Sequence, residues 1–561
     1  MYYIVGVTIA LGLLIFVHEL GHFLLAKRAG VGVKKFSLGF GPKIIGKKWG
    51  ETEYVISAFP LGGYVNLEGE NPGEEPVNKE KSFTDKPPLA KLSIAAAGPI
   101  FNLLFAIIII AVIYSLGIAM LSPFVGEVEE GMPAASAGLK YGDTIVAING
   151  NPIYSWDDMT SLIHTSGGKK LEFTIKRGKK TFERTIIPSE KEVANVFGEK
   201  SKVGLVGIRP TTLSPRIGEV KKGSLAERSG FKQGDFIKKI GNKRMEAWSQ
   251  IKETDISFLA GPIKMILQRE KTGVKAGNQE SDEVELEDVL IEVPVPGDAN
   301  LKESLADYLG IGSTELYIER AEKGYPADLA GLKPYDKIVK VNGKNLKSWT
   351  DFEEVIIKSP GKKIDIEADR EGEIKKVSIV PKSESKRNML DEKIDVGVIG
   401  LYSANRYTEP KSEIIKFSPP AALLKSVERT GYLTVMMFKG IGMLATGKIS
   451  SKNISGPIAI AKMAGDQAKK GAYDFAFFVA FISINLGIIN FIPLGTITDG
   501  GLILLFIIEW IIGKQINMKL REVTQYIGIV LIVSLMGFAI YNDFTRYLGD
   551  IVAYFARLLG V

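Results

Sequence analysis

Long apolar stretches lie at both ends of the chain and enclose a central region, residues 122–415, in which polar and apolar residues alternate in short runs. A helix needs roughly 20 mainly apolar residues to cross a bilayer. The third stretch contains Pro493 and several glycines, which predicts a broken helix. The pattern therefore predicts a multi-domain membrane protein with a polytopic α-helical core of about four spans, at residues 2–26, 92–121, 474–510 and 524–541.

One further apolar stretch, residues 430–446, is short and contains Lys439. A charge within a short stretch favours a helix that lies at the membrane surface or packs against other helices. A fifth span stays open as the alternative. The first stretch, residues 2–26, lacks the basic leading segment of a signal peptide, so we expect it to be retained.

The central region contains one motif three times. Residues 131–156, 223–248 and 324–349 align without gaps over 26 positions. Each copy has a small residue at the start of a short helix, a glycine at its end, an acidic residue and then an alternating apolar strand. The copies start 92 and 101 residues apart, which suits separate globular domains. The shared positions are Ala134, Ala226 and Ala327; Gly138, Gly230 and Gly331; Asp143, Asp235 and Asp336.

The chain has three histidines and no cysteine, and two histidines lie four residues apart in the first apolar stretch. Residues i and i+4 share one face of a helix, so His18 and His22 can bind one metal ion, and the spacing suits zinc. In this pattern Glu19 acts as general base toward a water molecule that zinc activates. A charge at mid-bilayer costs roughly 2.5 to 3.5 kcal/mol, so we expect these polar groups to form a functional site.

The third metal ligand is expected to be a carboxylate. Catalytic zinc takes three protein ligands and keeps one position for water. Cysteine is absent, and the remaining histidine, His164, lies in a polar stretch. Asp499 is the first candidate because it lies in the broken third span, where irregular backbone can line a polar cavity, and Glu509 is the second. The alternative is an ordinary helix kink with an aspartate near the membrane surface.

Four motifs together resemble the site-2 protease family of intramembrane zinc metalloproteases, in particular its bacterial RseP-like branch with PDZ domains. They are His18-Glu19-x-x-His22, Gly98-Pro99-Ile-Phe-Asn102, Ser455-Gly456-Pro457 and the segment from Asn490 to Gly501. The resemblance implies that Asp499 completes the zinc site and that Asn490 holds substrate. The chain departs from the family pattern at Gly495, where a proline is usual, and at Thr498, where leucine is usual, and the loop is one residue longer.

By the same resemblance, the three repeats look like tandem PDZ domains, which bind extended peptides or C-termini at a sheet edge. The family usually has two, so a third is a departure. Residues 271–288 are polar and are expected to form a mobile insertion. The predicted domains are residues 1–121, the first transmembrane half; 122–190, 205–296 and 305–384, the PDZ domains; 412–465, an interfacial helix region; and 466–561, the second transmembrane half.

Residues 34–42 and 54–67, between the first two spans, are predicted β-strands with glycine turns. The resemblance implies a small membrane-associated β-sheet whose edge pairs with unwound substrate, with Gly62, Gly63 and Tyr64 in contact with it. The alternative is a solvated hairpin with no role in substrate binding.

Basic residues predict how the chain crosses the membrane. They cluster in the loop of residues 27–91, which places that loop in the cytoplasm by the positive-inside rule. The N-terminus and the repeat region then lie on the outer, periplasmic face of a bacterial inner membrane. The net charge of +7 is modest for 561 residues, and we find no basic motif typical of nucleic-acid binding.

The combined prediction is a zinc-dependent intramembrane endopeptidase that cleaves single-span membrane proteins. By resemblance, its substrates are an anti-sigma factor already cleaved outside, or remnant signal peptides. A membrane-anchored PDZ adaptor without proteolytic activity is the alternative from another class. A metal transporter fits less well, because transport does not need a general base such as Glu19 beside the metal.

Overall fold

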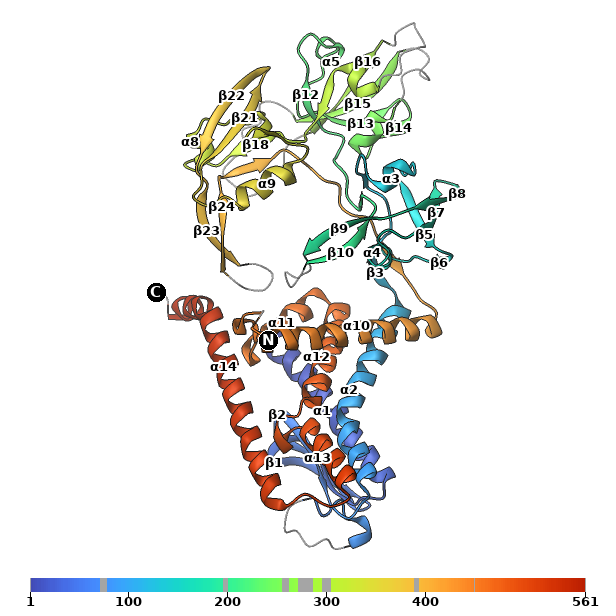
Figure 1. Ribbon diagram of the computed structural model, residues 1–561, viewed down its shortest axis with the longest axis vertical. Coiled ribbons are helices and arrows are strands. Elements are labelled where there is room, and N and C mark those ends of the chain that lie inside the picture. Colours follow the sequence, from blue (N-terminus) through green and yellow to red (C-terminus); the bar gives the residue numbers. More distant parts are fainter. Residues whose placement is uncertain are drawn as a thin grey trace. The chain divides into compact units, whose positions relative to one another are not determined.

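The computed structural model describes residues 2–70, 78–194, 200–254, 262–270, 286–294, 304–387, 393–447 and 449–559. The chain forms two compact units (Figure 1). Met1–Ile118 and Ile415–Val561 make a mainly helical unit, and Ala119–Ile414 makes a unit of β-sheets and short helices. Most of the insertion predicted at residues 271–288 lies outside the described residues, and only its end, from residue 286, is described.

Four helices in the described part of the chain are long and apolar enough to cross a membrane, one for each predicted span. They are α1 (Tyr2–Arg28), α2 (Pro88–Leu116), α12 (Ala472–Phe491) and α14 (Met518–Leu559). Large apolar side chains such as Ile108 and Val533 face outward, which suits a lipid environment. The stretch predicted as interfacial or as a fifth span belongs to α10 (Pro419–Ala445), which is not among these four helices.

The third apolar stretch is broken, as predicted. After α12 ends, the 3-10 helix η4 (Gly495–Ile497) leads into α13 (Asp499–Ile512). The Thr498 hydroxyl caps α13 by accepting the Gly501 N–H at 3.3 Å. A Cβ atom on Gly501 would lie 1.5 Å from the Gly495 carbonyl oxygen, so only glycine allows this backbone contact. The tight loop places Asp499 in the first turn of α13.

Close packing holds the helices that carry the predicted site. Gly21 lets α1 approach α2, because a Cβ there would lie 2.5 Å from the Ala97 carbonyl oxygen. Phe506 of α13 packs in one buried cluster with Ile94 of α2, and Leu14 of α1 packs with apolar residues of α12. The helix α11 (Pro457–Lys470) also packs against α1.

The start of α11 is capped from another helix. The Asp543 carboxylate of α14 accepts the backbone N–H groups of Gly456, Ile458 and Ala459 at 2.9 to 3.0 Å. A carboxylate satisfies the free N–H groups of a helix start and interacts favourably with its dipole. The motif around Gly456, which the sequence singles out, therefore joins α11 to α14.

The strands β1 (Val33–Trp49) and β2 (Thr52–Leu67) form the hairpin predicted between the first two spans. Both strands bend, so that Phe36 of β1 lies opposite two residues of β2, Tyr54 and Val65. The end of β2, residues 63–67, is consequently an edge that pairs with no third strand among the described residues.

The three repeats fold alike. The strands run Asp143–Ile148, Asn151–Pro152, Leu171–Arg177 and Lys180–Ile186 (β5 to β8); Phe236–Ile240, Lys243–Arg244, Ile263–Glu270 and Leu286–Val293 (β13 to β16); Lys337–Val341, Lys344–Asn345, Ile364–Arg370 and Glu373–Ile379 (β19 to β22). Each set forms a four-stranded antiparallel sheet with the same order, β6-β5-β7-β8 in the first repeat. Each begins with a one-turn helix, α3 (Pro133–Ser136), α5 (Leu225–Arg228) or α8 (Pro326–Leu329), and continues with a second helix, α4 (Trp156–His164), α6 (Trp248–Lys252) or α9 (Trp349–Ile357).

The acidic residue of the motif is buried in every repeat and has the same partner. In the first repeat, the Asp143 carboxylate accepts Nε–H and Nη2–H of Arg177 at 2.6 and 2.8 Å. The same Nη2 group also donates to the carbonyl oxygen of Gly138, the glycine that ends the short helix. Asp235 with Arg269 and Asp336 with Arg370 repeat this arrangement. Bidentate pairing satisfies the buried charge, so this cluster holds each module together.

The remaining elements belong to the repeats or lie between the parts already described. They are η1 (Lys79–Lys81), β3 (Ile118–Leu121), β4 (Glu127–Val128), β9 (Ser189–Ala194), β10 (Lys200–Leu205), β11 (Ile208–Arg209), β12 (Ile217–Val220), α7 (Leu305–Leu309), β17 (Ile311–Ser313), β18 (Ile318–Ala321), β23 (Lys382–Arg387), β24 (Lys393–Val398), β25 (Leu401–Ser403), β26 (Ser412–Ile415) and η3 (Ser451–Asn453).

Candidate metal centre

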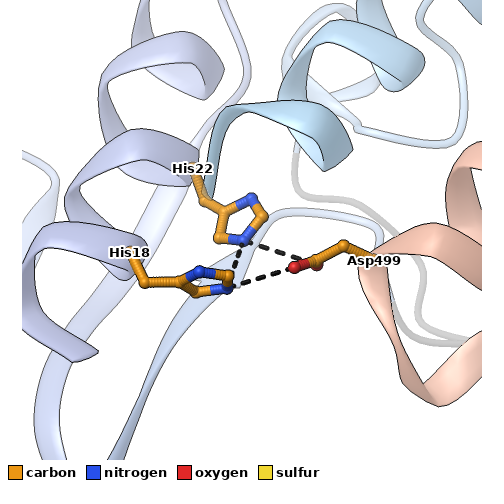
Figure 2. A group of neighbouring side chains, drawn as sticks. All are labelled: His18, His22 and Asp499. Atoms are coloured by element: carbon orange, nitrogen blue, oxygen red, sulfur yellow. Dashed lines mark hydrogen bonds and ion pairs between the residues drawn. The ribbon is translucent and has the colours of Figure 1, made fainter. Parts of the chain in front are cut away.

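Two helices bring the three predicted metal ligands together (Figure 2). His18 and His22 lie on one face of α1, one turn apart, and Asp499 lies at the start of α13. His18 Nε2 is 3.1 Å from Asp499 Oδ2, and His22 Nε2 is 3.4 Å from Asp499 Oδ1. The two Nε2 atoms are 3.2 Å apart. Among the described residues, these three are the group of histidine and acidic side chains that could hold a metal ion.

The spacing of these atoms fits zinc. Ligands at roughly 2.0 to 2.1 Å in a tetrahedral site lie about 3.3 Å from one another. The three observed separations, 3.1, 3.2 and 3.4 Å, bracket that value. Two imidazoles and one carboxylate also form a ligand set typical of catalytic zinc, which keeps a fourth position for water.

Gly98 of α2 leaves room for the imidazoles. A Cβ atom at this position would lie 2.3 Å from His22 Nε2 and 2.8 Å from His18 Nε2. Any larger residue would therefore occupy the space in front of the two nitrogens that face Asp499. Gly98 belongs to the Gly-Pro-x-x-Asn segment, for which the sequence alone predicts no role.

The outer nitrogens of both rings have partners on α2. His22 Nδ1–H donates to the Ile94 carbonyl oxygen at 2.8 Å, which leaves Nε2 free to bind a metal. His18 Nδ1 lies 3.2 Å from the side-chain amide of Asn102. Metal-binding histidines in proteins almost always have such a second contact, because it fixes the ring orientation.

Two further predicted site residues lie nearby. Asn490, near the end of α12, places its side-chain amide 3.5 Å from His18 Nε2. Glu19 lies on α1 beside the free edge of β2, where a Cβ on Gly63 would lie 3.1 Å from Glu19 Cγ.

The other predicted substrate residues lie in this edge or, for Gly62, directly before it. Gly63 and Tyr64 of β2 lie opposite Leu38 and Ser37 of β1. The Tyr64 ring stacks on Phe40, with ring centroids 6.2 Å apart. Gly62 also lies close to the Phe40 ring. A Cβ atom added at Gly62 would be 1.8 Å from that ring, so the contact requires glycine.

Glu509, the second candidate ligand, lies outside the cluster. It is 2% exposed and accepts the Arg521 Nη2–H at 2.8 Å and the Ile516 N–H at 3.1 Å. Lys91 Nζ lies 3.7 Å from its other oxygen. His164 is exposed at the end of α4 in the β-rich unit. Sequence reasoning missed Lys91 and Arg521 as partners of Glu509, although each is a basic residue beside an apolar stretch.

Comparison with known proteins identifies the family. The model of peptidase family M50 matches residues 6–535. The chain belongs to this family. A relative from Vibrio cholerae serotype O1 is 32% identical over 552 residues, which cover 97% of this chain and 98% of the relative. The regulator of sigma-E protease RseP from Escherichia coli and the protease RseP from Yersinia pestis are each 29% identical and cover 96% of this chain and 97% of their own length.

This M50 peptidase is therefore a zinc metalloprotease that acts within the membrane, which confirms the predicted cofactor and enzyme class. The adaptor alternative is not favoured. Two solved structures are also similar. The PDZ domain of the SdrC-like protein from Listeria monocytogenes is 25% identical, with a TM-score of 0.13, over 16% of this chain and 88% of its own. A PDZ domain protein from Parabacteroides distasonis is 10% identical, with a TM-score of 0.13, over 53% and 99%.

Proposed function

We propose that this M50 peptidase holds its zinc ion with His18, His22 and Asp499 and hydrolyses a peptide bond within single-span membrane proteins. The observation that carries the assignment is the convergence of these three side chains from α1 and α13, at separations of 3.1 to 3.4 Å, in the helical unit. Three such groups in a membrane-spanning unit are costly without a role.

The chain's own residues divide the chemistry. Zinc, when bound, polarises the substrate carbonyl and lowers the pKa of water. Glu19 accepts the proton of the attacking water and returns it to the leaving amine. The Asn490 amide, 3.5 Å from His18 Nε2, orients the substrate backbone at the site.

The free edge of β2 provides a place for the substrate. A helical peptide bond is shielded and already hydrogen-bonded, so the substrate must unwind before cleavage. An extended segment can pair with an unpaired strand edge through main-chain hydrogen bonds. Gly62, Gly63 and Tyr64 belong to the end of β2, and the same end contacts Glu19. Pairing there brings the unwound backbone next to the general base.

The three repeats act as PDZ-like domains, at residues 122–190, 205–296 and 305–384. Support comes from the recurring sheet order and the recurring buried ion pair. The transmembrane halves are residues 1–121 and 466–561, with an interfacial helix region at 412–465. Basic residues in the loop of residues 27–91 support a cytoplasmic loop and periplasmic repeats in a bacterial inner membrane.

The substrate class follows from the relatives. The Escherichia coli relative is named a regulator of sigma-E protease, which supports an anti-sigma factor already cleaved on the outer face as substrate. Remnant signal peptides are also single apolar segments and fit the same site. PDZ-like repeats that bind extended peptides or C-termini suit either class.

The test compares membrane fractions of cells that carry the parent protein, Glu19→Gln or Glu80→Gln. Removing a general base lowers the rate by about 10²- to 10⁴-fold. We expect Glu19→Gln to keep its zinc and to cause uncleaved single-span fragments to accumulate, as measured by quantitative proteomics. Glu80 is an exposed carboxylate in η1, so its substitution controls for the loss of one charge and leaves the fragment pattern unchanged.

The opposite result, without accumulated fragments, would contradict the proposed function. If the Glu19→Gln protein carries zinc and no fragment accumulates, the proposed proteolysis is wrong. That result would support the hypothesis of a membrane-anchored PDZ adaptor. Zinc flux across vesicles that contain the parent protein would instead support a transporter.

A further inference from the structure

Asn102 is the outer partner of His18, and the direction of the hydrogen bond between them has a consequence for metal binding. It lies on α2, one turn after Gly98, and is 0% exposed. Its backbone carbonyl accepts the Ser483 hydroxyl of α12 at 2.7 Å, which anchors the residue from behind. Its side-chain Nδ2 is 3.2 Å from His18 Nδ1, and its Oδ1 is buried without a hydrogen-bond partner among the described residues.

Only one end of the Asn102 amide has a partner among the described residues, the end that faces His18 Nδ1. The two ends of the amide have nearly the same shape, so a half turn about the Cβ–Cγ bond exchanges Oδ1 and Nδ2 without moving other atoms. After that turn, Oδ1 faces His18 Nδ1 and can accept a hydrogen bond from it. The oxygen thereby gains a partner, and Nδ2 takes the position that the oxygen leaves.

The direction of this hydrogen bond decides what His18 can do. A neutral imidazole carries one proton. If Asn102 donates to Nδ1, the proton is on Nε2, and Nε2 then has no lone pair for zinc. If Oδ1 accepts from Nδ1–H, the Nε2 lone pair is free and faces Asp499 Oδ2 at 3.1 Å.

His22 provides an internal reference. Its Nδ1 faces the Ile94 carbonyl oxygen at 2.8 Å, and a carbonyl oxygen can only accept. His22 is therefore protonated on Nδ1 and presents Nε2 to the metal. Two ligands of one zinc ion that present the same nitrogen need the same tautomer, so His18 also needs an acceptor at Nδ1.

We propose that Asn102 is a positioning residue for the zinc ligand His18. Its Oδ1 accepts the His18 Nδ1–H, fixes the ring in the tautomer that leaves Nε2 free, and aims Nε2 at the point shared with His22 and Asp499. The inference rests on the proposed ligation of zinc by His18.

The first test measures zinc affinity by chelator competition on the purified full-length protein. Asn102→Leu keeps a similar volume and removes the acceptor, and Asn102→Asp keeps an acceptor and removes the donor. Losing such an outer partner typically weakens metal binding about 10- to 100-fold. We expect that loss for Asn102→Leu and an affinity close to the parent's for Asn102→Asp. Asn485→Leu makes the same substitution on α12, where the side-chain amide donates to the Phe481 carbonyl oxygen of its own helix, and serves as the control with unchanged affinity.

The second test reads the tautomer directly. The chain has three histidines, and replacing the exposed His164 by glutamine leaves only the two at the site. In the zinc-loaded His164→Gln protein, labelled with ¹⁵N-histidine, nuclear magnetic resonance distinguishes a protonated ring nitrogen from one that binds metal. We expect both rings to be protonated at Nδ1 and to bind zinc through Nε2, and the same pattern in the Asn102→Asp variant.

Several results would overturn the inference. Zinc binding by Asn102→Leu as tight as in the parent contradicts it, and so does a zinc affinity of Asn102→Asp as weak as that of Asn102→Leu. A His18 ring that binds zinc through Nδ1 also contradicts it. If Asn102→Leu does not fold, Asn102→Asp and the ring protonation still decide. If the parent itself binds no stoichiometric zinc, the proposed ligand set fails, which is a separate outcome.

Discussion

Both units of this protein contain aspartate side chains that are largely shielded from solvent, and these aspartates have different partners. In the repeats, Asp143 meets two N–H groups of Arg177, so its charge has a complete set of donors within the module. In the helical unit, Asp499 meets His18 and His22, each within 3.4 Å. The Nε2 atoms of the two rings are 3.2 Å apart, and each can offer a lone pair to the same point.

The difference separates a structural pair from a binding site. A buried carboxylate with a bidentate arginine is satisfied by the protein alone and occurs identically in three modules. A carboxylate that shares its space with two imidazole nitrogens gains most when a cation from outside joins them. A shielded aspartate therefore points to a candidate metal site when its neighbours are side chains that could also bind a metal ion.

The largest effect is expected when a larger side chain fills the space between the candidate zinc ligands. Gly98→Ala places a Cβ 2.3 Å from His22 Nε2, so the imidazoles must move away from the shared point. We expect zinc affinity to fall by more than the roughly 10- to 100-fold loss of an outer partner, and cleavage to be lost with it. Zinc content and cleavage of a single-span substrate in detergent measure both effects.

Gly12→Ala is the matched control for Gly98→Ala. It makes the same change in a membrane helix, at a position where an added Cβ meets nothing within 4 Å. Normal zinc content in Gly98→Ala would contradict the placement of the ligands around that glycine.

A smaller effect, confined to stability, is expected when the aspartate–arginine pair of a repeat loses its arginine. Arg177→Ala leaves the fully buried Asp143 carboxylate without its bidentate partner. Removing one member of a buried pair costs about 3 to 5 kcal/mol, and we expect the low end because Arg177 itself is 39% exposed. Hydrogen exchange of β5 and β7 in the full chain measures the loss.

Zinc content should not change in Arg177→Ala, because the pair lies in a different unit from the metal centre. Lys180→Ala removes an exposed cation from the residue opposite Arg177 and should leave hydrogen exchange as in the parent. Exchange in Arg177→Ala as slow as in the parent would show that the pair does not hold the module together.

The smallest effect is expected at an exposed pair. Glu51 lies in the turn between β1 and β2. A hydrogen bond from Lys27 and a weaker effect of one from Lys81 hold the pKa of Glu51 at about 2, below its usual 4.5. An exposed ion pair contributes at most about 1 kcal/mol, so Glu51→Gln should lower stability by no more than that.

The pH dependence gives this prediction its sign. Because the folded-state pKa is depressed, the contribution of Glu51 is present above about pH 4.5 and disappears as the pH falls toward about 2. The difference in stability between the parent and Glu51→Gln should therefore shrink with acidification, as measured by thermal unfolding. A difference that grows in acid would mean that Glu51 is stabilised when protonated.

The candidate metal ligands could be predicted from the sequence, because local patterns in the chain point to them. The four-residue spacing of His18 and His22 predicts a shared helix face, and the break in the third apolar stretch directed attention to Asp499. The membrane helices and the three repeats could also be predicted from the sequence, because the length of an apolar stretch and the repetition of a motif are visible in the sequence itself.

Residues that act through distant contacts could not be predicted. Asn102 lies 84 positions from His18, and Arg177 lies 34 positions from Asp143. No local pattern distinguishes such a residue from any other buried amide or strand arginine. For the arginine a clue existed, since an arginine follows the motif aspartate by 34 residues in all three repeats.

X-ray absorption at the zinc edge of the purified full-length protein tests the central claim most directly. We expect one zinc ion per chain, bound by two imidazole nitrogens and a carboxylate oxygen at roughly 2.0 to 2.2 Å, and loss of the zinc in Asp499→Ala. A spectrum with one imidazole or none, or an Asp499→Ala protein that keeps its zinc with an unchanged spectrum, would contradict it.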